Sequence, residues 1–486
     1  MLAYFPIPGL LRSVYPQTFK IKGMKKFNTY ILIILTISAL SGCKKQNDWL
    51  NEKTNKSDIV PQKIGDYQAI LDNTLEMNER AFINSGLVAS DNMFIRDKDV
   101  AVLWEYERNI YLWQGNYWEG GNSSEWNYGF RGVEFSNLVL EGLAAINNVT
   151  AEHNNVMGQA YFYRAFALYN LAQLFCKPYT ETSAGSDLGL PIRETSDVNV
   201  IIRERSSLKQ TYDFILADLQ HAIELLPQTQ PYNTRPNVRA AKALLSKVYL
   251  VMEDYAKAGI YADQVLTAYG QLLDFNNTSI INYNSDNRFP LYGTNNPEIL
   301  FYAQKYNYTS ITAATINTGV IVPELYTSYS SDDLRKTLLY TTRDGAVRYV
   351  GSYTGWYYNF VGIATNELYL IRAECSARNG SKDQALADLN LLLQKRFKTG
   401  TFTGITASSA EDALKLVLIE RRKELPFTAN LRWEDLRRLN RDQRFQKTIT
   451  RTANGTVYTL LPNDKRYVFP IPDSEIEQSG IQQNER

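Results

Sequence analysis

The sequence has few of the residues that build metal centres and nucleophilic active sites. Only three cysteines and two histidines occur among 486 residues. The histidines, His153 and His221, are far apart in the sequence, and neither lies in a ligand motif. Zinc sites and Ser-His-Asp triads are therefore hard to build from this chain. We expect no metal ion, no cofactor and no catalytic residue.

Charge of one sign is also missing. The chain has 52 basic and 51 acidic residues, which leaves a formal net charge of +1. Proteins that bind nucleic acid usually present a strongly basic surface. We therefore exclude nucleic acid as a partner.

Two of the cysteines, Cys176 and Cys375, lie in apolar helical patterns nearly 200 residues apart. Two isolated cysteines make no disulfide framework. Unpaired cysteine behaves as a small apolar residue, so we expect both thiols to be buried and free.

The N-terminal region lacks an apolar run long enough to span a membrane, because the polar residues Lys44 to Asp48 follow too soon after Ile31 to Ile37. Lys25 and Lys26 precede this short run, as in a secretory signal. The tetrad Leu40-Ser41-Gly42-Cys43 resembles the bacterial lipoprotein box. This resemblance implies cleavage before Cys43 and a lipid anchor on that cysteine. The alternative is ordinary secretion with Cys43 as a bystander.

The same region suggests how the chain is divided. Residues 1–23 lack signal character, so we interpret them as a mis-called upstream extension and take Met24 as the true start. A signal peptide then covers 24–42, and a polar, flexible tether covers 43–56. Residues 57–486 are long enough for one large domain with an ample core.

Helical periodicity is strong in most of this domain. The clearest helix is expected over Glu152 to Phe175, with Pro178 ending it. Two helix pairs, Ala240 to Leu266 and Asn366 to Phe397, have the length of degenerate tetratricopeptide repeats. Further helices are expected over Asp58 to Met77, Arg131 to Asn147, Ser207 to Leu226, Glu411 to Glu424 and Trp433 to Leu439.

Two regions, 82–126 and 270–360, have no sustained period and are rich in aromatic residues, glycine and asparagine. We predict exposed loops for the first region. The second is too long for one structureless loop, so we predict an irregular lobe of short helices and strands. The whole chain has 33 Tyr, 20 Phe and 7 Trp, so some aromatic side chains could serve a ligand rather than the core.

Five groups of residues stand out along the mature chain. They are Tyr163-Arg164-Ala165-Phe166 with Leu171 and Phe175; Ala241-Lys242-Ala243-Leu244-Leu245 with Tyr249-Leu250; Asn366-Glu367-Leu368-Tyr369-Leu370-Ile371-Arg372-Ala373-Glu374; Glu420-Arg421-Arg422-Lys423-Glu424-Leu425 with Arg432-Trp433-Glu434-Asp435-Leu436-Arg437-Arg438; and Phe469-Pro470-Ile471-Pro472. Each segment alone is a weak signal, but their order and spacing are specific, and they span nearly the whole mature chain. Together they resemble the SusD/RagB family of outer-membrane nutrient-binding lipoproteins of Bacteroidota.

The resemblance implies a mainly α fold, in which a tetratricopeptide-like helical repeat scaffold carries an irregular loop-rich lobe. It also implies a lipid-anchored protein of the cell outer membrane, facing the cell exterior. Such a protein captures a glycan and delivers it to a SusC-like TonB-dependent transporter without catalysis.

The matched motifs are mostly structural. We expect Arg164 and Glu374 to make buried polar contacts between helices. We also expect Trp433 to be buried, with Arg437 and Arg438 reaching the acids between Glu420 and Glu424.

Binding residues of this family lie in variable loops, so the candidate site comes from the sequence itself. Aromatic residues flanked by Gly or Asn, outside any helical period, are expected to be exposed on turns. Sugar rings stack on such flat side chains. The predicted ligand-binding residues are Trp113, Trp118, Trp356 and Tyr357, with Tyr283 and Tyr308 as weaker candidates.

Two alternatives remain open. Degenerate helical repeats can form concave surfaces that hold peptides, so the chain could instead serve a peptide importer. A glycoside hydrolase would need two carboxylates at a set separation. Four acids lie among the aromatic residues of 82–126, namely Glu105, Glu107, Glu119 and Glu125. No motif singles out two of them as a catalytic pair.

Overall fold

The structure is a computed structural model that describes residues 61–80, 84–115, 117–118, 121–305, 308–314 and 317–486. The predicted signal peptide, the predicted lipid attachment site at Cys43 and the predicted tether lie outside these residues. Over the described ranges, every helix is too short or too polar to cross a membrane.

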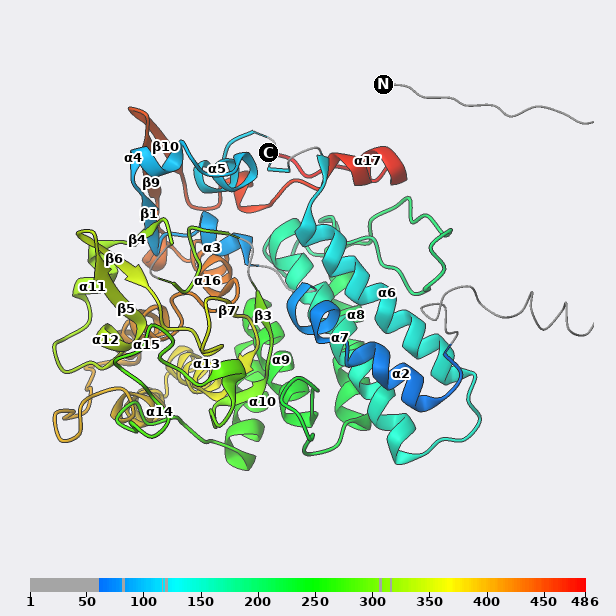
Figure 1. The fold of residues 1–486 in the computed structure, drawn as a ribbon, viewed down its shortest axis with the longest axis horizontal. Helices are drawn as coiled ribbons and strands as arrows, with labels where there is room; N and C mark the ends of the chain where they lie inside the picture. Colours follow the sequence, from blue (N-terminus) through cyan, green and yellow to red (C-terminus); the bar gives the residue numbers. More distant parts are fainter. Residues whose placement is uncertain (1–60, 81–83, 116, 119–120, 306–307, 315–316) are drawn as a thin grey trace, which may run out of the picture. The chain divides into compact units, whose positions relative to one another are not determined.

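Helices dominate the unit Gln62–Arg486, as predicted (Figure 1). The longer ones are α2 (Ile64–Leu71), α5 (Glu105–Leu112), α6 (Ser124–Ala144), α7 (Ala151–Phe175), α8 (Leu208–Leu225), α9 (Val238–Val251), α10 (Tyr255–Ala268), α13 (Thr365–Arg378), α14 (Lys382–Gln394), α15 (Ala410–Glu424), α16 (Leu431–Leu439) and α17 (Asp473–Ser479). Shorter ones are η1 (Leu75–Arg80), α3 (Ser85–Ala89), α4 (Asp97–Val100), η3 (Leu291–Gly293), α11 (Pro323–Thr327), α12 (Arg335–Leu339), η4 (Gln443–Phe445) and η5 (Lys465–Tyr467).

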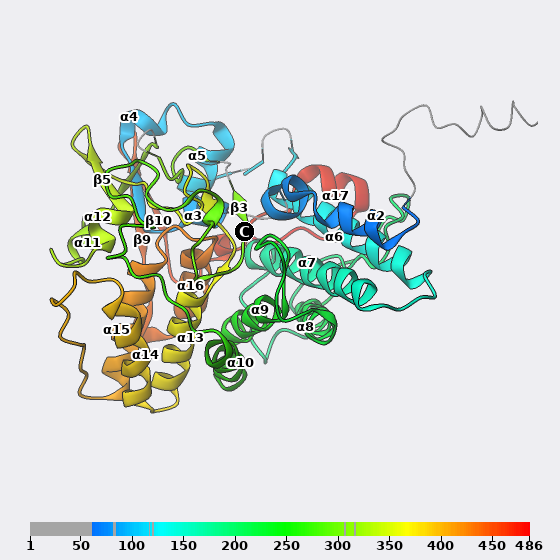
Figure 2. The same cartoon turned by 60° about the horizontal axis from the view of Figure 1, so that its bottom comes forward.

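The long helices form a continuous row in which each packs against the next. The row runs from α6 through α7, α8, α9 and α10 to α13, α14 and α15 (Figures 1 and 2). Helix α7 begins where the Thr150 hydroxyl accepts a hydrogen bond from His153 N at 3.1 Å. Most of its side chains are buried, since it has neighbours on several sides.

The two predicted repeats are present as α9 with α10 and α13 with α14. The two pairs adjoin where α10 packs on α13. A Cβ atom added to Gly259 would lie 3.3 Å from Cys375 Cβ, so the glycine allows a close approach of these helices. Cys176 and Cys375 are buried and free, which confirms that prediction.

The irregular lobe contains short helices and strands, as predicted for 270–360. The described residues include ten strands in antiparallel pairs: β1 (Met93–Ile95) with β4 (Gly319–Ile321), β2 (Ile299–Phe301) with β8 (Ile363–Ala364), β3 (Gln304–Lys305) with β7 (Asn359–Phe360), β5 (Tyr340–Arg343) with β6 (Ala346–Tyr349), and β9 (Ile449–Ala453) with β10 (Thr456–Leu460). Both β2 and β3 pair with strands that lie just before α13. The lobe is thereby joined to the helical repeats.

Two local predictions were wrong. The helix predicted over Asp58 to Met77 is not continuous: in the described residues α2 begins at Ile64, after the extended Lys63 and the Asp66 side chain that caps the N–H groups of Gln62 and Lys63, and η1 follows separately. Asp58 itself lies outside the described residues. Residues 82–126 are also not a set of exposed loops, since they include α3, β1, α4 and α5. These elements are short and are stabilised by tertiary packing, which local periodicity does not report.

The motif residues are structural, with one correction. Trp433 is fully buried, Arg164 contacts Asp218 of α8 and Asn137 of α6, and Glu374 contacts Arg438 of α16. Arg438 does not reach the acids of α15, because Glu374 and Asp435 surround its guanidinium. Arg437 instead donates to the carbonyl of Cys176.

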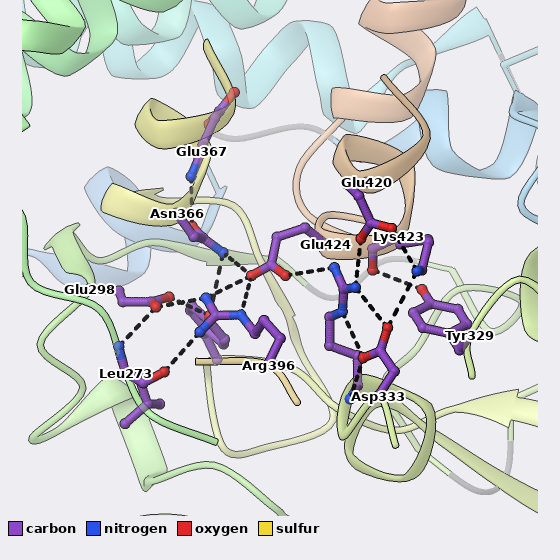
Figure 3. Close-up of polar contacts among 12 residues, drawn as sticks. Leu273, Glu298, Tyr329, Asp333, Asn366, Glu367, Arg396, Glu420, Lys423 and Glu424 are labelled. Carbon is purple, nitrogen blue, oxygen red and sulfur yellow. Dashed lines mark hydrogen bonds and ion pairs between the residues drawn. The ribbon is translucent and has the colours of Figure 1, made fainter. Parts of the chain in front are cut away.

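A buried network of charged side chains joins the lobe to the repeats (Figure 3). Glu424 of α15 accepts from Arg396 at 2.8 Å and pairs with Arg335 at 3.2 Å. Arg396 also pairs with Glu298 at 2.7 Å. Breaking a buried pair leaves an uncompensated charge, which costs about 3–5 kcal/mol. The network therefore holds the two parts in one arrangement.

Candidate functional site

Trp113 is not an exposed loop residue, and the prediction of exposure is wrong. Only 1% of the residue is accessible, its indole Nε1 donates to Ala89 O at 3.0 Å, and the guanidinium of Arg451 lies 4.4 Å from the ring centroid. Its local conformation is still that of a turn, with a φ of 53°. The strand β9, far away in sequence, supplies the residue that covers it.

Trp118 is buried in the same way, at 4% exposure. Its Nε1 donates to Pro470 O at 2.7 Å, and its ring centroid lies 6.2 Å from that of Phe469. The expectation of an exposed ring was wrong here too. Residues of the C-terminal tail pack over this side chain.

The two weaker candidates are also engaged inside the protein. Tyr308 is 2% exposed, against the expectation, and its hydroxyl donates to Glu125 Oε1 at 2.8 Å. Tyr283 is half-buried, and its hydroxyl donates to Phe275 O at 2.7 Å. Both hydroxyls are thus used within the protein, and the Tyr308 ring is not open to a sugar.

Trp356 and Tyr357 are exposed, at 38% and 36%. Their ring centroids are 5.3 Å apart with an interplanar angle of 45°. Hydrogen bonds with Trp356 and then Tyr358 lower the pKa of the Tyr357 hydroxyl. The two rings thus contact each other and form one exposed aromatic surface.

The turn that carries them is built around Thr354 and Gly355. The Thr354 hydroxyl accepts from Trp356 N at 3.2 Å and lies 2.9 Å from Tyr358 O, to which it can donate. Gly355 has a φ of 63°, and an added Cβ would lie 2.4 Å from the carbonyl oxygens of Phe289 and Pro290. Only glycine fits this close approach of two backbone segments.

Two further tyrosines join this surface, and the sequence reasoning missed both. Tyr292 N donates to Thr354 O at 2.7 Å, and Tyr292 is 54% exposed. The ring centroid of Tyr358 lies 4.7 Å from that of Tyr357. The signal for Tyr292 was its position before Gly293, the same turn chemistry that marked Trp356. We call Tyr292, Trp356, Tyr357 and Tyr358 the aromatic patch.

The residue before this turn connects the aromatic patch to the buried charge network. Tyr353 donates its hydroxyl to Glu298, which pairs with Arg396. Burial, followed by the adjacent Glu298 carboxylate, raises the pKa of the Tyr353 hydroxyl well above its ordinary value. A rigid scaffold beneath an exposed turn is a common arrangement for binding residues.

The acids that could have served hydrolysis have structural partners. Glu107 accepts from Ser310 N at 2.9 Å, and Glu125 accepts from Tyr308. Burial, offset in part by Lys305 and by the Tyr308 hydroxyl, raises the pKa of Glu125. Glu105 is exposed, and Glu119 lies outside the described residues. Within the described ranges, no group of three or more His, Cys, Asp or Glu side chains could hold a metal ion.

Family models match nearly the whole of this chain. Residues 48–250 match a model described as "Starch-binding associating with outer membrane", and residues 271–486 match the model of the SusD family. SusD-like protein P2 of Formosa agariphila is 26% identical over 416 residues, which cover 74% of this chain and 79% of that protein.

Solved structures have the same fold. A SusD superfamily protein from Bacteroides thetaiotaomicron, 23% identical, matches with a TM-score of 0.70 over 87% of this chain and 100% of its own. A laminarin-binding SusD-like protein, 17% identical, matches with a TM-score of 0.59 over 86% of this chain and 97% of its own. With its helical repeats and two adjoining family matches, the chain belongs to the SusD/RagB family.

Proposed function

We propose that the protein captures an oligo- or polysaccharide on the aromatic patch and delivers it to a SusC-like TonB-dependent transporter. It acts without catalysis. It is held on the outer membrane by lipid on Cys43 and faces the cell exterior. Membership of a family whose model is described as starch-binding and associated with the outer membrane supports this proposal.

The observation that carries the proposal is the pair of exposed rings, Trp356 and Tyr357. They lie on a turn whose backbone is held by hydrogen bonds of the Thr354 hydroxyl. A sugar ring has an apolar C–H face that can lie on an aromatic ring, while its hydroxyls remain solvated. Fixed rings lose little conformational freedom on binding. The laminarin-binding relative supports a glycan as the ligand class.

A glycan panel tests the proposal directly. Purified protein that begins at Gln62 is expected to bind at least one of laminarin, amylose, xylan and mannan in affinity electrophoresis. The variant Trp356→Ala should lose that binding, and Trp104→Ala, which removes an exposed ring elsewhere, should not. Binding that survives Trp356→Ala would place the site away from the aromatic patch.

Delivery and anchoring have separate tests. A fatty-acid probe should label the wild-type protein in cells and not Cys43→Ala. The transporter should co-purify with the wild-type protein from detergent-solubilised outer membranes. Equal labelling of both proteins would contradict the lipid anchor.

Peptide capture has less support. A groove of about 620 Å³ between α10 and α13 has Arg372, Arg378 and Asp263 in its wall. These charges are already paired: Arg372 contacts Asp263 at 2.7 Å and Arg378 contacts Glu374 at 2.8 Å. A peptide would have to displace existing ion pairs, whereas a glycan needs no such change at the aromatic patch.

A further inference from the structure

A carboxylate, that of Glu79, lies near the aromatic patch. Glu79 of η1 is half-buried, and its Oε1 accepts from Gln304 Nε2 at 2.9 Å. Gln304 Oε1 in turn accepts from the Tyr302 hydroxyl at 2.5 Å. This chain of contacts orients the carboxylate of Glu79 from the protein side.

Tyr302 connects Glu79 to the aromatic patch. A Cβ atom added to Gly293 would lie 3.1 Å from the Tyr302 ring, so this ring lies directly against the turn that carries Tyr292. Burial, followed by the negative field of Glu79, raises the pKa of Tyr302 above its ordinary value. Burial, followed by the Tyr357 hydroxyl and then by Glu79, raises the pKa of Tyr358 to about 12.

The neighbouring cations are directed elsewhere. The guanidinium of Arg80 lies 5.3 Å from the centroid of the Tyr128 ring and pairs with Glu76. Lys305 is buried, lies 5.6 Å from the same ring centroid, and donates to Arg80 O at 3.3 Å. Both cations thus contact Tyr128, and Glu79 contributes to the pKa of Lys305. The charged group that affects the pKa of the Tyr357 and Tyr358 hydroxyls is the carboxylate of Glu79.

We propose that the aromatic patch selects uncharged glycans and rejects glycans that carry uronate or sulfate groups, with Glu79 as the discriminating residue. This inference rests on the proposed function. A carboxylate can only accept hydrogen bonds, so it can pair with the hydroxyl groups of a neutral sugar. Carboxylate and sulfate groups are normally bound by arginine or lysine, and they are repelled by a fixed carboxylate. Specificity here comes from a repulsive group as much as from an attractive surface.

Matched ligands that differ only in charge provide the test. Laminarin and amylose are each oxidised at C6 to give uronate forms of the same chain length and linkage. Binding of all four glycans is measured by calorimetry at low salt, where interactions between exposed charges are least screened. The proteins are the wild type, Glu79→Gln, Glu79→Lys and Trp356→Ala. Asp383→Asn is the control, because Asp383 is an exposed acid on α14 whose side chain is 94% accessible.

The wild type is expected to bind the neutral form at least about tenfold more tightly than the oxidised form. Glu79→Gln should reduce this ratio severalfold, Glu79→Lys should reduce it further, and Asp383→Asn should leave it unchanged. Raising the salt concentration should also reduce the ratio in the wild type.

The failures are distinguishable. If Trp356→Ala abolishes binding but the wild type binds oxidised and neutral forms equally, charge selection is wrong and the proposed site stands. If the ratio is large but insensitive to both Glu79 variants, Glu79 is not the discriminating residue. If Trp356→Ala binds the glycans as tightly as the wild type, the proposed site itself fails and the inference fails with it. The same conclusion follows if the wild type binds neither these four glycans nor any other glycan of the panel.

Discussion

Two short segments rich in aromatic residues and glycine differ in burial: one is buried in the core and the other is exposed. Around Gly115, Trp113 and Trp118 are buried, whereas beside Gly355, Trp356 and Tyr357 are exposed. Both segments turn where the sequence predicted, since Gly115 and Gly355 have φ values of 52° and 63°. The glycine therefore marks a turn in both segments, but the neighbouring aromatic rings are exposed only beside Gly355.

The difference lies in what packs on each segment from elsewhere. Trp113 is covered by Arg451 of β9, and Trp118 is covered by Phe469 and Pro470. On the segment with Trp356, the contacts of Thr354 and Gly355 fix the backbone, and the rings of Trp356 and Tyr357 stay exposed to solvent. One segment is thus part of the core, and the other is a supported surface.

The largest expected effect is on the buried segment. Trp118→Ala should lower the free energy of unfolding by about 3–5 kcal/mol, as for other core aromatic residues, because it leaves a cavity beside Phe469. Urea denaturation measures the loss. The matched control is Trp104→Ala, at a residue that is 64% exposed, which should change stability by less than about 0.5 kcal/mol. Normal stability with lost glycan binding would instead make Trp118 a ligand contact.

The buried part of the protein also contains charged side chains such as Glu374, which make its stability sensitive to acid. Burial opposes ionisation of Glu374, but Arg438, Arg378 and Arg421 outweigh it and lower its pKa to about 2 from an ordinary 4.5. A lowered folded pKa stabilises the protein above pH 4.5, and this contribution is lost as the pH falls from about 4.5 toward 2. Its size is roughly 3 kcal/mol.

The variant Glu374→Gln tests this contribution. Its deficit in unfolding free energy relative to the wild type should be full at pH 6 and should shrink as the pH falls below about 4.5. Denaturation curves at pH 6, 4 and 3 measure it, with Asp383→Asn as the exposed control. A deficit that stays constant with pH would attribute the effect to lost packing rather than to charge.

On the exposed segment the expected effects are reversed. Trp356→Ala should leave the unfolding free energy within about 0.5 kcal/mol of the wild type. It should weaken glycan binding by at least about tenfold, as expected when a central aromatic contact is removed. Calorimetry and thermal melting on the same preparation check both numbers. Substantial destabilisation would erase the distinction between the two segments.

The smallest expected effect concerns the support of the exposed rings. Thr354→Val keeps the shape of the side chain but removes the hydroxyl that contacts Trp356 N and Tyr358 O, a loss of about 1 kcal/mol. Glycan affinity should fall severalfold, with the tryptophan fluorescence of the turn altered. Thr354→Ser retains the hydroxyl and should restore both signals. Equal behaviour of the two variants would exclude a positioning role for the hydroxyl.

Long helices were the easiest features to predict, because one apolar face repeats over many turns. Helix α7 and the pairs α9–α10 and α13–α14 lie within a few residues of the predicted ranges. The short elements α3, α4 and α5 were missed, since four to eight residues are too few for a period to show. Of the candidate site, Trp356 and Tyr357 are exposed as predicted, whereas Trp113, Trp118 and Tyr308 are buried.

The sequence by itself determined the mainly α fold, the free cysteines, the structural role of Trp433 and the places where the chain turns. These follow from local periodicity, residue size and backbone preference, which act over a few residues. Tertiary structure decided which aromatic turns are covered and which stay open. That outcome depends on partners such as Arg451 and Phe469, more than 300 residues away from the tryptophans they cover. No local pattern encodes such a contact, because burial is a property of the assembled fold.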